Sequence, residues 1–379
     1  MSVQPLFYVI LTLLLIALLL QIIDHFHHLP SKSKVTFEQK NTSETNFSYS
    51  DLRKKFSRLG VEKQKNIKLN NLIGVFPFIW TYLYIIISVL LFSMTDLMVA
   101  QLLLVLFVTG RFRSLQEIGH QAIHGALMPD RKLSMLLTDI LFQYPAFMMN
   151  AKQRRTTHVK THHKAIAMPY DPDLIEMTDV GFKPGLTNTQ FVLGVLFPLT
   201  PKGLIQRFRE CVSVVLNGSP LRFASVAVIV TLFSYFGLYY EMIFLYIVPV
   251  FITYPLFYWI AHIALHRWYT DCTDNVPYHE REMILGRPTK FEGITGFIIK
   301  HNIFPIGDSY HLAHSLHPTV RWNYLPQVDT MLRNNIAEYA NNESVNLFFP
   351  GKDKPSALSE LKETMVSVTS NKAESSCQL

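Results

Sequence analysis

The sequence predicts an all-α polytopic membrane protein with two transmembrane hairpins, an N-terminal anchor and a helical cap on the cytoplasmic side. Three observations support this prediction. Of the 379 residues, 49% are hydrophobic and only 17% are charged. The apolar residues form blocks long enough for helices that cross a bilayer, which need about 20 apolar residues each. Ten of the fifteen histidines fall in four short clusters at or just beyond the polar ends of such blocks.

The first apolar block, residues 6–23, contains no charged residue. It is long for a signal peptide, lacks a basic start, and is followed by Asp24 and His25 and not by a small-residue cleavage site. We therefore interpret residues 1–28 as a retained membrane anchor. Residues 29–71 form a polar linker, and seven Lys and Arg residues in its second half predict a basic segment facing cytoplasmic lipid.

Two pairs of apolar runs predict the hairpins. Runs 72–94 and 97–109 are separated by two residues, and the second run continues into the helix with the first histidine cluster. Runs 223–237 and 242–261 are also joined by a short turn. Such short turns leave little chain on the far side of the membrane. All the long basic connections then lie on one side, which the positive-inside rule identifies as cytoplasmic.

The remaining segments complete the predicted domain organisation. Runs 133–149 and 191–199 are apolar but short, which favours interfacial or re-entrant helices. We expect a membrane domain over residues 72–330 and a C-terminal extension over residues 331–379. The extension is expected to be partly disordered, with the disorder beginning after Pro350, where Ser, Lys and Glu are abundant.

Charge and cysteine content exclude two classes of partner or site. The net charge is +7, but the basic residues lie between apolar runs and no nucleic-acid-binding motif accompanies them. Membrane topology explains this charge, and no nucleic acid partner is expected. Cys211, Cys272 and Cys377 form no CxxC pair, so a thiolate metal site is not indicated.

The spacing of the histidines indicates a metal centre. Residues four apart share a helix face, and a neutral imidazole can bind iron, copper, zinc or nickel. Adjacent residues point about 100° apart on a helix, so a His-His doublet can serve two ions. Nine imidazoles are too many for one four-coordinate zinc and suit two ions of higher coordination number. The clusters are His120 and His124; His158, His162 and His163; His262 and His266; and His311, His314 and His317.

Three of these clusters carry a resemblance to a known family. GHQAIHGAL at 119–127 is similar to the first histidine box of the membrane fatty acid desaturase superfamily. HVKTHH at 158–163 resembles the second box, and an Asp-Pro-Asp sequence follows it at 171–173. YHLAHSLHP at 310–318 resembles the third box. The resemblance covers roughly residues 72–330.

The resemblance implies a centre of two non-haem iron ions that uses O2 to oxidise an unactivated C–H bond. The implied reaction is desaturation of a fatty acyl chain of a lipid or acyl thioester. Hydroxylation, ketolation or decarboxylation of a lipid or terpenoid at the same type of site is the alternative. The expected iron ligands are His120, His124, His158, His162, His163, His262, His266, His311 and His314. The site is expected on the cytoplasmic face of an integral membrane protein.

Electrons for this chemistry are expected from a separate donor of the ferredoxin or cytochrome b5 type, with its reductase. The chain has no cysteine spacing for an iron–sulfur cluster and no glycine-rich dinucleotide fingerprint. No appended haem domain is evident either. The other expected partners are the lipid or acyl substrate and the bilayer.

The third box departs from the family pattern, because position 315 is Ser where a second histidine of a doublet is usual. Two residues could replace the lost ligand. His262 lies one turn before His266, at a place where some family members have Asn. His317 is the other candidate, although Pro318 restricts its backbone. We favour His262.

Other side chains near the boxes have two readings each. Glu117, Asp171, Asp173 and Asp308 could accept hydrogen bonds from the imidazoles, or act as helix caps and surface ion pairs. Arg154 and Arg155 could hold an anionic headgroup or could mark the cytoplasmic side of the membrane.

Two functions from other classes are also compatible with clustered histidines. A membrane zinc hydrolase is disfavoured because no HExxH sequence, with its glutamate base, is present. A non-catalytic metal-binding or transport protein is disfavoured because transporters place ligands at mid-membrane depth. The clusters in this chain lie at or beyond the ends of the apolar runs.

Overall fold

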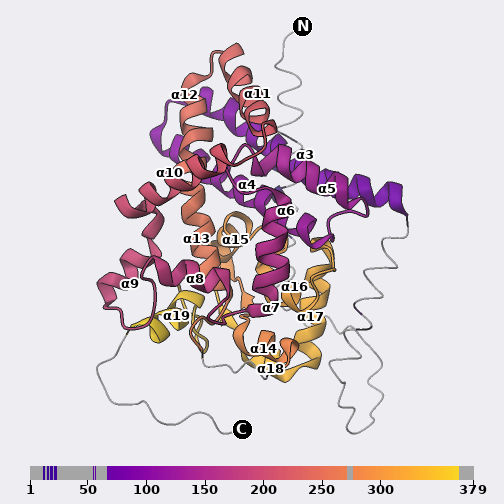
Figure 1. Ribbon diagram of the computed structural model, residues 1–379, viewed down its shortest axis with the longest axis vertical. Coiled ribbons are helices and arrows are strands. Elements are labelled where there is room, and N and C mark those ends of the chain that lie inside the picture. The colour runs from indigo at the N-terminus through magenta and orange to yellow at the C-terminus, as the bar shows by residue number, and fades with distance from the viewer. Residues whose placement is uncertain are drawn as a thin grey trace.

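The computed structural model describes residues 66–270 and 276–366, with scattered positions within 12–23 and at 54 and 56. The predicted anchor and most of the predicted linker lie outside these residues. Within them the regular structure is almost entirely helical (Figure 1). A parallel pair of two-residue strands, β1 (Thr289–Lys290) and β2 (Ser344–Val345), is the sheet in this part of the chain. The all-α prediction is therefore confirmed.

Three helical stretches are long and apolar enough to cross a membrane. The first two are α3 (Ile67–Ser93) and α4 (Met98–His124), which form the predicted first hairpin. The third, Tyr239–Leu265, includes two short π-helical segments. Its elements are α12 (Tyr239–Met242), η4 (Ile243–Ile247), η5 (Pro249–Thr253) and α13 (Tyr254–Leu265).

The outgoing arm of the second predicted hairpin, run 223–237, is the helix α11 (Leu221–Tyr235), which passes as a candidate span only together with the helix before it. That helix is α10 (Pro201–Leu216), and the two meet at a bend of 116°. On α10, Ile205 and Phe208 are exposed while Arg207 is buried. This placement leaves an apolar face of α10 outward, as lipid contact requires.

The two short apolar runs form helices too short to span a bilayer. Run 133–149 overlaps α5 (Arg131–Thr138) and includes the π-helix η1 (Asp139–Gln143). Run 191–199 overlaps α9 (Asn188–Val195) and includes the 3-10 helix η3 (Phe197–Leu199). Each α-helix begins at a side-chain cap, Asp130 for α5 and Thr187 for α9, which satisfies free N–H groups of the first turn.

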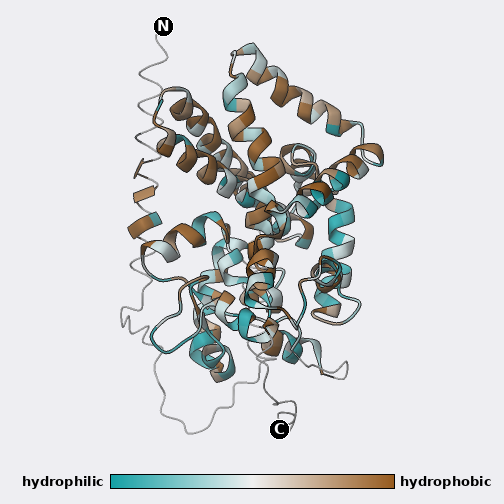
Figure 2. Cartoon of the chain, turned by 90° about the vertical axis from the view of Figure 1, so that its left-hand side faces the viewer, coloured by the Kyte–Doolittle hydropathy of each residue, from teal (hydrophilic) through white to brown (hydrophobic). Residues whose placement is uncertain are grey.

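The remaining helices form a more polar half of the molecule. In Figure 1, α3, α4, α11 and α12 lie in the upper half and α14, α16, α17 and α18 in the lower half. Figure 2 shows that the upper helices are mainly hydrophobic and that hydrophilic residues concentrate below. The polar half contains α6 (Ala151–Arg154), η2 (Arg155–His162), α7 (His163–Ala165), α8 (Pro172–Asp179), α14 (Tyr278–Leu285), α15 (Gly293–Asn302), η6 (Asp308–Tyr310), α16 (His311–Leu316), η7 (Trp322–Tyr324), α17 (Leu325–Asn335), α18 (Ala337–Asn341) and α19 (Ala357–Met365).

Two large apolar clusters form the core of the described residues. One packs α3, α4 and the third span together, with Phe78, Leu115 and Tyr254 buried in it. The other packs α13 against α19 through Trp259 and Leu361. The prediction of disorder beginning after Pro350 is therefore wrong for α19, because its apolar face is buried in this core.

Candidate metal centre

The four histidine clusters converge in the interior between the two halves. The first cluster lies on the last turns of α4, and the second on η2 and the start of α7. The third cluster lies at the end of α13, and the fourth on α16. Eight imidazoles form one connected set of ring contacts, in which each ring contacts at least one other: His120, His124, His158, His162, His163, His266, His311 and His314.

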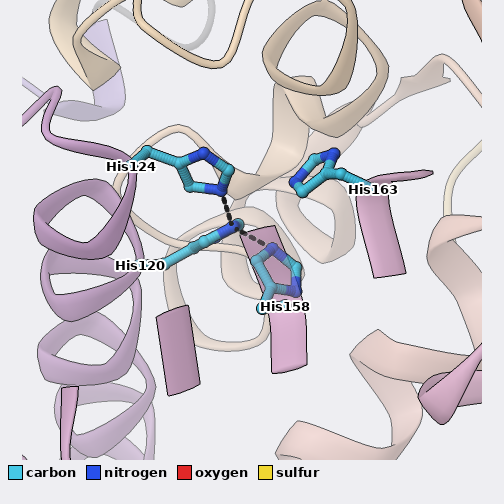
Figure 3. Close-up of side chains that lie close together, drawn as sticks. All are labelled: His120, His124, His158 and His163. Atoms are coloured by element: carbon cyan, nitrogen blue, oxygen red, sulfur yellow. Dashed lines mark hydrogen bonds between the residues drawn. The ribbon is translucent and has the colours of Figure 1, made fainter. Parts of the chain in front are cut away.

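One group of four imidazoles can hold a single ion. In His120, His124, His158 and His163, one ring nitrogen per residue lies within 4.8 Å of the others. The Nε2 atom of His120 lies 2.7 Å from Nε2 of His158 and 3.2 Å from Nε2 of His124 (Figure 3). Figure 3 shows the four rings facing a common point from α4 and from the second cluster.

A second group adjoins the first. The Nε2 atoms of His266 and His311 are 3.2 Å apart, and the ring of His162 lies 5.4 Å from that of His266. The ring of His314 lies between the groups, 4.5 Å from His124 and 6.1 Å from His311. Both nitrogens of His314 are buried with no hydrogen-bond partner among the described residues.

Carboxylates orient three of these rings by contacting the nitrogen that faces away from the centre. The Nδ1 distances are 2.8 Å for His120 and Glu117, 2.9 Å for His162 and Asp171, and 3.3 Å for His311 and Asp308. Asp173 also lies 3.3 Å from Nδ1 of His162. An ionised carboxylate only accepts hydrogen bonds, so these partners assign the ring proton to Nδ1. The Nε2 lone pairs are thereby left for a metal.

A buried arginine, Arg113, links two of these carboxylates. Its Nη1 lies 2.9 Å from Glu117, and its Nη2 lies 2.9 Å from Asp308. The guanidinium therefore pairs with both acids and links the first histidine cluster to the third box. The sequence offered one signal for this role, since Arg113 lies one turn before Glu117 on the same helix.

Burial keeps most of these imidazoles neutral, which is the form that binds a metal. Removal from water lowers the pKa of His158, His266 and His314 well below the usual value. His162 differs. Burial also acts to lower its pKa, but the carboxylates of Asp173 and Asp171 raise that pKa to about 9.

Comparison with known protein families gives a match over the part of the chain that forms this site. A family model described as fatty acid desaturase matches residues 95–344, about two thirds of the chain. The chain belongs to the fatty acid desaturase family. The matched region begins just before α4 and ends at β2, so it includes every histidine of both groups. A search of curated proteins finds no match.

The donor set fits the metal that the family implies. Imidazole nitrogens suit iron, and four of them, from His120, His124, His158 and His163, lie close enough together to hold one ion.

The end of α13 differs from the expected geometry. We expected His262 and His266 to share one helix face, but α13 ends at Leu265 and His266 has extended backbone angles (φ −124°, ψ 162°). The expectation of a shared face is wrong, because the helix ends one residue before His266. His266 consequently faces the imidazole groups, where its Nε2 lies beside His311.

His262 lies in a different environment from His266. Its ring stacks on those of Trp259 and Trp268, with centroids 5.7 Å and 5.5 Å away. Its Nε2 lies 3.3 Å from the backbone oxygen of Asp173, and its Nδ1 lies 3.8 Å from the carboxylate of that residue. Since Asp173 also contacts His162, His262 is connected to the centre through an acid. Its role as the ninth ligand stays a prediction.

Residue 315 is a serine and contributes no imidazole to the centre. Ser315 is 0% exposed, and its Oγ has no hydrogen-bond partner among the described residues. The hydroxyl of Tyr278 on α14 donates to the backbone oxygen of Ser315 at 3.0 Å. His317, the other replacement considered, packs its ring against Phe56 with centroids 4.6 Å apart.

Arg154 and Arg155 fasten the second cluster to α4. Arg154 donates to the backbone oxygen of Gln116 at 3.1 Å, and Arg155 donates to the backbone oxygen of Ile123. These contacts hold η2 against the helix that carries His120. The sequence could not indicate them, because both acceptors are backbone atoms remote in the chain.

Proposed function

We propose that this protein is an O2-dependent di-iron oxidoreductase that desaturates a fatty acyl chain of a lipid or acyl thioester. Family membership supports a desaturase-type oxidoreductase that acts on lipid in a membrane. The observation that carries the proposal is the pair of adjoining imidazole groups. In three of their rings, the Nδ1 atom contacts a carboxylate. The proposed iron ligands are the eight converging histidines, with His262 as the ninth.

Iron and O2, when bound, would supply an oxidant able to break an unactivated C–H bond. The contribution of the chain itself is orientation and exclusion of water. Glu117, Asp171 and Asp308 hold their imidazoles with Nε2 inward, and Arg113 fixes two of these acids through ion pairs. Such support around metal ligands sets their orientation and basicity.

The proposed location is an integral membrane protein with its metal centre on the cytoplasmic face. The short turns after α3 and after α11 support this topology, because they leave the long basic connections on the other side. Exposed Lys152, Lys160 and Lys164 flank the second cluster on that side. We propose a separate electron donor of the ferredoxin or cytochrome b5 type.

The reaction is tested by expressing the chain with a redox partner and analysing cellular lipids by mass. Desaturation predicts a product that has lost two hydrogen atoms, and its formation should require O2. A product that has gained an oxygen atom would instead support hydroxylation or ketolation. A shorter product would support decarboxylation. The matched control is His120→Ala, which should abolish whichever product appears.

A further inference from the structure

Helix α14 bridges the second and third histidine boxes although it belongs to neither. At its N-terminal end, Tyr278 donates to the backbone oxygen of Ser315. One turn later, Arg281 donates to the backbone oxygen of Lys164 at 2.5 Å, just after the second box. The helix therefore lies against the place where the third box lacks an imidazole.

The same helix buries a carboxylate for which the described residues provide no hydrogen-bond partner. Glu282 is 0% exposed, and neither of its oxygens has a hydrogen-bond partner among the described residues. An unpaired carboxylate in such a place is strongly unfavourable unless a positive charge or a donor compensates it. His163 faces it, with 3.9 Å between its Nδ1 and Oε1 of Glu282.

His163 differs from the three rings that are already held by acids. Its Nδ1 lies 3.3 Å from the hydroxyl of Tyr278, and its Nε2 is buried without a partner in the described part of the chain. In Figure 3 its ring faces His124, His120 and His158. Because the Tyr278 hydroxyl donates to Ser315, it can accept from His163, so Nδ1 carries the proton and Nε2 remains free for a metal.

We propose that Glu282 is a positioning residue that holds His163 for a divalent metal ion, as the fourth member of the set formed by Glu117, Asp171 and Asp308. A cation at Nε2 makes the Nδ1 proton a stronger donor, and the carboxylate at 3.9 Å then closes onto it. Tyr278 joins this pair to Ser315, so α14 supports the centre where the usual imidazole is missing. The inference rests on the proposed metal-binding function.

The test uses the full-length chain, purified in lipid nanodiscs and stripped of metal, with Co²⁺ as the probe. In Glu282→Gln the affinity for Co²⁺ should fall about 10–100-fold, the usual effect of removing an acid behind a ligating imidazole. Glu338→Gln, at an exposed position of α18, is the matched control and should bind as the wild type does. The absorption bands of the saturated Co²⁺ complex should be unchanged in Glu282→Gln, because its carboxylate is not a ligand.

Thermal unfolding separates positioning from a merely structural role. Without metal, Glu282→Gln should be at least as stable as the wild type, because a neutral amide of similar size replaces a buried carboxyl group that has no hydrogen-bond partner among the described residues. With metal, the rise in Tm should be smaller than in the wild type. Equal Co²⁺ affinity in the two proteins, a changed spectrum at saturation, or loss of metal-free stability would each overturn the inference. A wild-type protein that binds no metal would overturn the proposed function and the inference together.

Discussion

At the scale of single residues, the orientation of the imidazoles depends on residues other than histidine. Spacing in the sequence was enough to identify the clusters and to expect nearby acids at Glu117, Asp171 and Asp308. It was not enough to identify Arg113 as the link between two acids, because Asp308 is remote in sequence. Tyr278 and Glu282 were missed for the same reason, since helix packing alone brings them to His163.

Replacing Arg113 with alanine should strongly destabilise the protein. The change leaves Glu117 and Asp308 buried without their shared positive partner. Breaking a buried ion pair from one side typically costs about 3–5 kcal/mol. Thermal unfolding in detergent measures the loss. Arg209→Ala, an exposed arginine on α10, serves as the control and should change stability by less than about 0.5 kcal/mol. Equal effects of the two changes would refute a role for the link.

The candidates for the ninth ligand make opposite predictions. His262→Ala should lower the iron content of the purified protein, because it removes the proposed ninth ligand. His317→Ala should leave the iron content unchanged, since that ring packs against Phe56. Iron is measured by elemental analysis at matched protein concentration. Full iron occupancy and normal activity in His262→Ala would eliminate His262 as the ninth ligand.

At the scale of elements, the apolar run of α4 predicted a helix that continues into the first box, and the structure confirms it. The end of α13 was not predictable from spacing, because residues four apart occur equally in a helix and in a helix followed by extended chain. The π-helical turns of η2 were also missed. In a π-helix each backbone hydrogen bond spans five residues and not the four of an α-helix, and no residue pattern in the sequence marks that change.

Gly125 ends α4 immediately after His124, and its substitution should destabilise this end of the helix. Its φ is +74°, and an added Cβ would lie 2.8 Å from Nε of Arg131. Left-handed backbone costs about 1–2 kcal/mol for a residue with a Cβ. Gly125→Ala should therefore lower Tm. Gly237→Ala is the matched control, because Gly237 has a φ of +68° but no atom near its Cβ position. A larger drop in Tm for the control would contradict this account.

At the scale of the whole molecule, hydropathy and charge predicted the membrane class, and the family match agrees with it. They did not predict the bend between α10 and α11, because the break at residues 217–220 could also have belonged to a loop before a straight helix. Nor did composition reveal that α19 packs on α13. Its apolar residues are few and stand among Ser, Lys and Glu.

The proposed topology predicts that the turn after α3 and the second histidine cluster lie on opposite sides of the membrane. Asp96→Cys and Lys160→Cys, each in a chain whose native cysteines are replaced by serine, place one label site on each side. An impermeant maleimide should label Asp96→Cys in intact cells and Lys160→Cys only after permeabilisation. Labelling of both sites in intact cells would contradict this topology.

The metal content of the purified wild-type protein tests the central claim most directly. The account predicts about two iron atoms per chain, lost in His120→Ala and His314→Ala, together with O2-dependent turnover of lipid. The two histidines come from different boxes, so loss of iron in both variants would show that the boxes share one centre. Zinc alone in the wild-type protein, without O2-dependent turnover, would contradict the account.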